Sequence, residues 1–348
     1  MDEIPAHLLR FGLGLAGGAV LGLAGRWAKF CTLGAIEDAV YGADWTRLRC
    51  WALAAALATA LTQAMALAGV VDLTRSIYLA PEIGWLGAVV GGLMFGFGMA
   101  LVGTCSYGTL LRCGGGDLRA LVVFLVIAVA AYATMRGLTG MGRVLLLERL
   151  RVDAALIGGP GFASAGSGLA AALTAGIAVA VLLLFALWKG ELIARARLLG
   201  GGLAIGAAVA FGWWITGAAA DDPFDPARVE SYSFVAPLGE ALVFLMTASG
   251  SRLDFMEGSV AGVLIGAFVA ARVAGEFRWE AYDDAREMKR HLLGAVLMGT
   301  GGIAALGCTI GQGITGVSTL SYASFLAIAA IFTGARAGLY WLVERGVR

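Results

Sequence analysis

The chain has 348 residues, of which 59% are hydrophobic and only 14% are charged, and its formal net charge is +1. A soluble globular protein carries about 25% charged residues, and a nucleic-acid-binding domain needs a basic patch that this charge balance does not supply. The composition therefore excludes a water-soluble fold, a disordered chain, a secreted disulfide scaffold and a nucleic-acid binder. It indicates an all-α polytopic protein embedded in a lipid bilayer.

The apolar stretches predict nine membrane crossings, since one spanning helix needs about 20 mostly apolar residues. The stretch 238–274 is too long for one helix and is interrupted by polar residues at 247–254, so we interpret it as a short dip followed by one full crossing. The Arg-rich stretch 136–151 is predicted to form an amphipathic helix on the outer surface. The predicted crossings are 8–25, 51–71, 85–103, 118–135, 164–188, 198–216, one within 238–274, 291–307 and 324–344.

Lysine and arginine residues predict the orientation, because they concentrate on the cytoplasmic side of membrane proteins. With the N-terminus outside, sixteen of them fall in cytoplasmic segments and eight in outer segments. The first residues, MDEIPAHLLR, are acidic where a signal peptide would be basic, so we expect the first apolar run to be a retained span. The sequence predicts a multi-pass protein with its N-terminus outside and its C-terminus in the cytoplasm.

Two glycine-rich segments resemble each other at an offset of 203 residues, and the predicted spans that contain them run in opposite directions. GGLMFGFGMALVGTCSYGTL (91–110) aligns with GAVLMGTGGIAALGCTIGQG (294–313), so that Gly91, Gly96, Gly98, Cys105 and Gly108 fall on Gly294, Gly299, Gly301, Cys308 and Gly311. This pattern predicts two inverted repeats of four spans, 1–135 and 198–348, separated by an outer loop and one connecting span in 136–197.

The glycines around Cys105 and Cys308 indicate paired broken or re-entrant helices. Irregular backbone at membrane depth survives only where protein buries it or where it lines a wet cavity, and such breaks in two inverted halves are typical of a transporter's central site. Helix N-termini at the breaks would direct N–H groups at an anion. A thiol in apolar surroundings stays neutral, and a neutral S–H group suits a soft, sulfur-terminated ligand better than sulfate or phosphate.

Several motifs resemble those of the YeeE/YedE family of bacterial sulfur-compound transporters. GTCSYG (103–108) and GCTIGQG (307–313) resemble its paired motifs, FCTLGAIEDAVYGADWTRLR (30–49) resembles its first-half segment, and GEFRW (275–279) with HLLGAVLMGTGG (291–302) resembles a later loop and span. The resemblance implies an hourglass-shaped inner-membrane transporter in which cysteines pass thiosulfate, a small sulfur-containing anion, along a narrow path. It also implies that Cys105 and Cys308 are path thiols, with Cys31 as a third candidate.

The residues beside these thiols are the predicted substrate-binding set. In the second half, we expect the place analogous to Phe30-Cys31 at Phe255-Met256, where no thiol stands. Five cysteines without a Cys-x-x-Cys pair and only two histidines assemble no metal site, and no cofactor is expected. The predicted set is Gly103, Ser106, Gly108, Gly307, Thr309, Gly311, Gln312 and Gly313.

Two other interpretations stay open at this point. One is a membrane thiol enzyme, a sulfurtransferase or redox relay with Cys105 as its nucleophile. The other is a transporter of another small anion, or of another sulfur or selenium species, in which the cysteines only pack. The mixed charges of 276–290 predict a solvated cytoplasmic helix, which offers a docking surface to a soluble sulfur-carrier protein.

Overall fold

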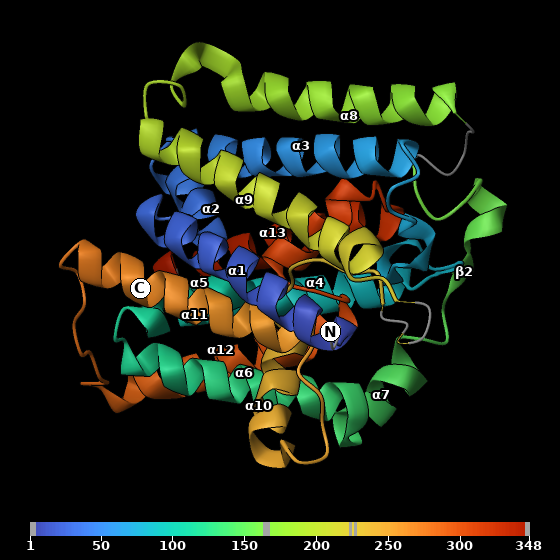
Figure 1. Ribbon diagram of the computed structural model, residues 1–348. Coiled ribbons are helices and arrows are strands. Elements are labelled where there is room, and N and C mark those ends of the chain that lie inside the picture. The colour runs from blue at the N-terminus through green and yellow to red at the C-terminus, as the bar shows by residue number, and fades with distance from the viewer. Residues whose placement is uncertain (1–4, 163–167, 223–224, 226–227, 345–348) are drawn as a thin grey trace.

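The computed structural model describes residues 5–162, 168–222, 225 and 228–344, and these residues form a bundle of helices that lie along a common direction (Figure 1). The only strands among them are two residues long, β1 (Glu82–Ile83) and β2 (Val152–Asp153), which pair antiparallel. The helices are α1 (Ala6–Trp27), α2 (Thr32–Tyr41), α3 (Thr46–Leu67), α4 (Trp85–Val102), α5 (Ser106–Gly114), α6 (Leu118–Arg136), α7 (Leu138–Leu146), α8 (Leu169–Leu187), α9 (Ala196–Trp214), α10 (Ala236–Thr247), α11 (Phe255–Val273), α12 (Ala285–Ala304) and α13 (Tyr322–Leu339).

Within the described ranges, eight helical segments are long and apolar enough to cross a membrane, which confirms an all-α polytopic membrane protein. They contain α1, α3, α4, α6, α8, α9, α11 and α13. The predicted span at 291–307 corresponds to α12, which has 20 residues and charged first turns and does not belong to the eight. It nevertheless packs lengthwise against α4 and α6 inside the bundle. The predicted dip and crossing within 238–274 are the short helix α10 and the full-length helix α11.

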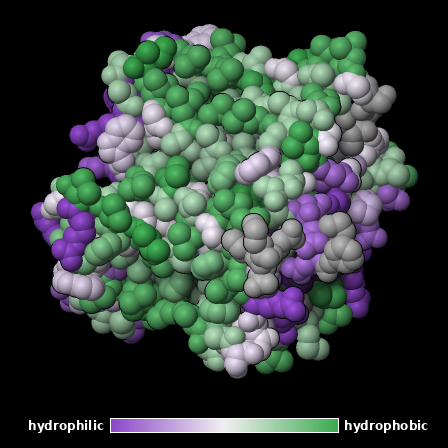
Figure 2. Space-filling model, in the orientation of Figure 1, coloured by the Kyte–Doolittle hydropathy of each residue, from purple (hydrophilic) through white to green (hydrophobic). Residues whose placement is uncertain are grey.

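Hydrophobic side chains cover the broad middle of the surface, and hydrophilic ones gather at its two ends (Figure 2). In the same orientation, α2 and α5 lie toward the left end of the bundle, whereas β2 and α7 lie at the right end (Figure 1). We call these ends the α2 face and the β2 face. Because the helices run between the two faces, the apolar middle is the band that a bilayer would cover.

Two surface segments test the predictions for the loops. A helix does form within 136–151, where α7 exposes large apolar side chains such as Leu138 and Leu146. The prediction for 276–290 is wrong in its first half, because the chain is irregular until α12 begins at Ala285. There, the backbone of Glu280 pairs with the turn before α6 and with Leu118, the first residue of α6. These hydrogen bonds take the place of those that a helix would form.

The two glycine-striped helices α4 and α12 pack antiparallel and in direct backbone contact. A Cβ on Gly91 would lie 2.6 Å from the carbonyl oxygen of Gly301, and a Cβ on Gly98 would lie 2.5 Å from that of Gly294. The contacts are reciprocal. A Cβ on Gly301 would lie 2.6 Å from the carbonyl oxygen of Gly91, and a Cβ on Gly294 would lie 2.7 Å from that of Gly98. Small residues allow this close approach in lipid, where helices are held by packing.

The other helices pack in matching pairs. Helix α1 lies along α11 and α9 along α3, while α4 lies along α13 and α12 along α6. Helix α8 stands apart at the edge and packs mainly on α3, and only a small share of its surface is buried (Figure 1).

Candidate functional site

Three short helices begin with the same four-residue pattern, a cysteine, a hydroxyl residue, any residue and a glycine. The patterns are Cys31-Thr-Leu-Gly34 before α2, Cys105-Ser-Tyr-Gly108 before α5, and Cys308-Thr-Ile-Gly311 at the start of a helical segment over 309–318. The last segment is partly π-helical, over Gly311–Gly316. The pattern places a thiol in the position where Ser, Thr or Asp usually caps a helix.

In all three helices the cysteine sulfur accepts a hydrogen bond from the N–H group of the glycine. The N···S distances are 3.5 Å for Cys31, 3.4 Å for Cys105 and 3.3 Å for Cys308. Cys308 accepts a second bond, at 3.3 Å, from the N–H group of Phe234. Because the sulfur accepts a hydrogen bond from the backbone, its S–H proton remains available for donation to a ligand. The glycine has no side chain that would cover the N-terminus of the helix.

The hydroxyl residue that follows each cysteine is buried. Within the described part of the chain, the hydroxyls of Thr32 and Ser106 have no hydrogen-bond partner, and that of Thr309 has only the Cys105 thiol beside it. Thr32 is 1% exposed, and Ser106 and Thr309 are fully buried. Buried hydroxyls are nearly always paired, because an unpaired one loses its bonds to water without replacement. Three such groups at equivalent positions indicate a site that is completed by a ligand.

The three helix starts converge although the chain separates them widely. The Cys105 thiol lies near the thiols of both Cys31 and Cys308, and the Thr309 hydroxyl lies beside it. The hydroxyl of Thr104 lies 4.0 Å from the sulfur of Cys31. Cys105 and Cys308 are buried, whereas Cys31 is half-buried. The structure thus brings the three predicted thiols together in one central cluster.

Cavities approach this cluster from both faces. On the β2 face a narrow pocket of about 30 Å³, lined by Tyr78 and Glu82 among others, reaches Gln312. Tyr78 also interacts electrostatically with Cys308. On the α2 face a pocket of about 10 Å³ reaches Cys31 between Lys29 and Arg47. That space is close to the size of one water, so the approach is constricted.

A larger cavity of about 210 Å³ opens beside Gly103 and Thr104, and we call it the basic vestibule. Arg112, Arg119 and Arg290 line it together with His291, while the acids in its wall are Asp117 and Glu287. Both acids pair with Arg119. Among the described residues, no carboxylate lies within ion-pair distance of Arg112 or Arg290. The vestibule therefore presents an excess of positive charge to an anion.

The predicted glycines have different local roles. Gly103 ends α4 with φ +79°, a left-handed conformation that favours glycine. Gly307 lies in the turn before Cys308. Gly311 leaves room for the Ser233 side chain, because a Cβ on Gly311 would lie 2.4 Å from the Oγ of Ser233. Gly313 packs on the Trp51 ring, at 2.4 Å from a Cβ built there, which assigns it to helix packing.

Gln312 and the remaining cysteines complete the comparison. Gln312 donates through Nε2 to the carbonyl oxygen of Ala305, while its Oε1 has no partner in the described structure. Cys50 donates to the carbonyl oxygen of Leu198 at 3.1 Å. Phe255 and Met256 open the full-length helix α11, so they do not stand before a short helix as Phe30 and Cys31 do. At the 203-residue offset Cys31 falls on Phe234, just before α10.

Thr32 and Thr104 belong to the cluster and were not predicted. The signal for Thr32 is the pattern itself, because Cys-Ser/Thr-x-Gly occurs three times in the chain. Thr104 carries no comparable signal in the sequence, since only folding brings it to Cys31.

Comparisons with known proteins agree with this geometry. A family model described as "Sulphur transport" matches residues 27–337. A curated relative named "Thiosulfate transporter TsuA", from Escherichia coli K12, is 27% identical over 92% of this chain and 91% of its own length. A protein of the same name from Spirochaeta thermophila is 28% identical over 70% of this chain and 73% of its own. The chain therefore belongs to the sulphur transport family, the YeeE/YedE family of its motifs, and is a multi-pass membrane transporter of sulfur compounds rather than an enzyme.

Proposed function

We propose that the protein imports a small sulfur oxyanion, in the first place thiosulfate, along a path lined by Cys308, Cys105 and Cys31. The observation that carries the proposal is the convergence of three helix starts, each with a thiol and a buried hydroxyl that has no oxygen or nitrogen partner in the described structure. Both relatives named above are thiosulfate transporters. The substrate-binding set is the one predicted from the sequence, without Gly313 and with Thr32 and Thr104 added.

The chemistry of the three helix starts matches the two ends of such an anion. A thiol is polarisable and donates weakly, which suits a terminal sulfur atom. The hydroxyls of Thr32, Ser106 and Thr309 donate to charged oxygens, and the partial positive charge of a helix N-terminus stabilises the anion as a whole. Because each thiol neighbours the next, the sulfur end can pass from one S–H group to another without entering lipid.

The charges at the α2 face favour it as the cytoplasmic face, where positive residues concentrate. The substrate would then enter from the β2 face past Tyr78 and leave through the basic vestibule, where Arg112 and Arg290 have no acidic partner among the residues that the structure describes. This orientation gives a bacterial inner-membrane protein with its N-terminus outside and its C-terminus in the cytoplasm. A soluble sulfur-carrier protein that meets the vestibule belongs to the same proposal.

We also propose that the protein consists of two inverted repeats, 1–135 and 198–348, connected through 136–197. The support is the antiparallel contact of α4 with α12, in which Gly91 meets Gly301 and Gly98 meets Gly294. Exchanging positions 203 residues apart converts one contact into the other, as a local two-fold axis requires. The pairing of α4 with α13 and of α12 with α6 obeys the same exchange, and that of α1 with α11 and of α9 with α3 follows it in helix order.

The test is uptake of ³⁵S-labelled thiosulfate into proteoliposomes that contain the purified protein. We expect Cys105→Ala and Cys308→Ala each to abolish most uptake, while Cys113→Ala retains it, because Cys113 is a free thiol that lines neither the Cys31 pocket nor the basic vestibule. Wild-type uptake by both path variants, at equal protein content, would exclude the thiol path. Thiosulfate uptake that survives Cys→Ser exchange at both positions would show that the two cysteines only pack, whereas a wild-type protein that takes up no thiosulfate would point to another anion as the substrate.

A further inference from the structure

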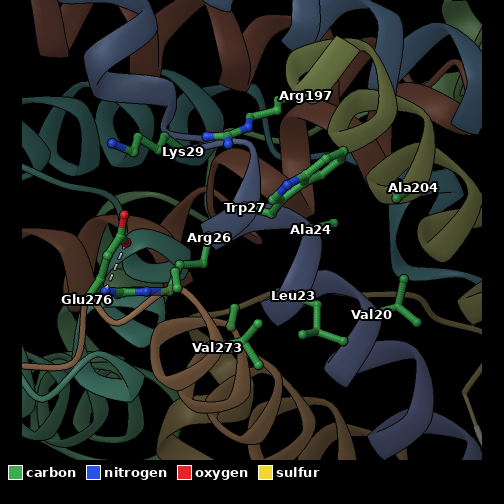
Figure 3. Close-up of a pocket in the computed structure, with 12 residues that line it drawn as sticks. Val20, Leu23, Ala24, Arg26, Trp27, Lys29, Arg197, Ala204, Val273 and Glu276 are labelled. Carbon is green, nitrogen blue, oxygen red and sulfur yellow. Dashed lines mark ion pairs between the residues drawn. The ribbon is translucent and has the colours of Figure 1, made fainter.

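A groove of about 580 Å³ lies on the outside of the bundle between α1, α9 and α11. It is separate from the thiol cluster and open to the surroundings of the protein. Its walls combine apolar side chains with cationic ones: Val20, Leu23, Trp27 and Val273 on the apolar side, and Arg26, Lys29 and Arg197 on the cationic side. Figure 3 shows Lys29 and Arg197 near each other at one end of the groove, with Trp27 beside them, and Leu23 and Val273 toward the other end.

The apolar side chains of the groove are left uncovered by the protein. Val20, Leu23 and Trp27 are 45%, 40% and 52% exposed, and Val273 is 84% exposed. From Val20 to Trp27 the groove follows α1 for seven residues, or about 10 Å along the helix axis. An acyl chain of a phospholipid fits an apolar wall of this length that faces the bilayer.

The charged end of the groove has more cations than anions. The Arg26 guanidinium lies 3.6 Å from the Glu276 carboxylate, and these two form an ion pair (Figure 3). Within the described structure, neither Lys29 nor Arg197 has an acidic partner at ion-pair distance. Both are exposed at the α2-face end of the apolar band. A phosphate group can therefore meet two uncompensated cations at the depth where phospholipid head groups lie.

We propose that this groove is a binding site for an anionic phospholipid, with the phosphate held by Lys29 and Arg197 and an acyl chain along Leu23 and Val273. A zwitterionic lipid fits less well, because its ammonium group would meet the same cations. Lys29 has φ +51° and stands two residues before Cys31, and it lines both this groove and the Cys31 pocket. The bound head group thus stands next to the α2-face end of the central cluster.

The experiment measures lipid binding to the full-length protein by native mass spectrometry and by the shift in Tm on adding lipid. Phosphatidylglycerol and phosphatidylcholine with identical acyl chains are the two probes. Each basic residue near the bilayer surface contributes about 1 kcal/mol to the binding of an anionic lipid. The two uncompensated cations therefore give an expected preference of about thirtyfold for phosphatidylglycerol.

The Lys29→Gln/Arg197→Gln double variant should lose this preference, while Arg286→Gln, which neutralises an exposed cation at the start of α12, should keep it. A retained preference in the double variant would place the lipid elsewhere. Equal binding of both lipids to the wild type, or occupation of the groove by a second copy seen as a dimer that the double variant disrupts, would overturn the proposal. None of these readouts depends on transport, so they stand whether or not thiosulfate is the substrate.

Discussion

The buried hydroxyl of Thr309 allows a test in which stability and transport change in opposite directions. Thr309→Val removes this hydroxyl and keeps the branched shape of the side chain. Thr309 is fully buried, and its only polar neighbour within the described structure is the Cys105 thiol, which is a weak hydrogen-bond partner. A buried polar group without a strong partner costs about 1–3 kcal/mol. The variant should therefore be more stable than the wild type by about that amount, seen as a rise of a few degrees in Tm.

Transport by the same variant should fall. A hydrogen bond to a charged group contributes about 1.5–3 kcal/mol, which corresponds to about a 10- to 150-fold loss of affinity. The expected result is a higher KM for thiosulfate uptake into proteoliposomes together with a higher Tm in detergent.

The matched control is Thr59→Val in α3, where a fully buried hydroxyl donates to the carbonyl oxygen of Ala55 at 2.7 Å. Loss of this satisfied bond should leave uptake at the wild-type level. If Thr309→Val lowered Tm and left KM unchanged, the hydroxyl would be structural, and the inference from unpaired groups to a ligand site would be refuted.

Three further predictions concern packing, charge and pH. Gly91→Ala should destabilise the protein by about 1–3 kcal/mol, because its Cβ would lie 2.6 Å from backbone atoms of α12, whereas Gly12→Ala, with nothing within 4 Å, should be neutral or stabilising in a thermal melt. Replacing Arg112 and Arg290 by Gln should raise the KM for the anion and weaken its dependence on salt, which kinetics at two ionic strengths would check. Hydrogen bonds from the side chain and backbone of the first residue of α3 lower the pKa of Asp44 to about 2. The contribution of the Asp44 carboxylate to stability is therefore complete above its ordinary pKa of 3.8 and is lost as the pH falls through about 2. The Tm of the Asp44→Ala variant should be lower than that of the wild type at pH 6, and the two Tm values should converge in strong acid.

Much of the fold could be predicted because membrane helices are determined locally. A run of apolar residues long enough to cross the bilayer must form a helix whatever its neighbours do, since lipid offers no partner to its backbone. The crossing predicted within 238–274 became the full-length helix α11 for this reason. The helix predicted over 276–290 began only at Ala285, because Glu280 pairs with a distant turn that local sequence does not reveal.

The sequence by itself determined the spans, the glycine stripes and the three Cys-Ser/Thr-x-Gly patterns, since each depends on residues within one or two helical turns. Only the tertiary structure decided that these patterns meet, that Thr309 lies beside Cys105, and that Thr104 joins Cys31. The cluster gathers residues from the beginning, the first third and the end of the chain. The physical reason is that helix packing in lipid depends on which small residues face each other, as Gly91 and Gly301 do, and this matching involves pairs of surfaces that no single segment contains.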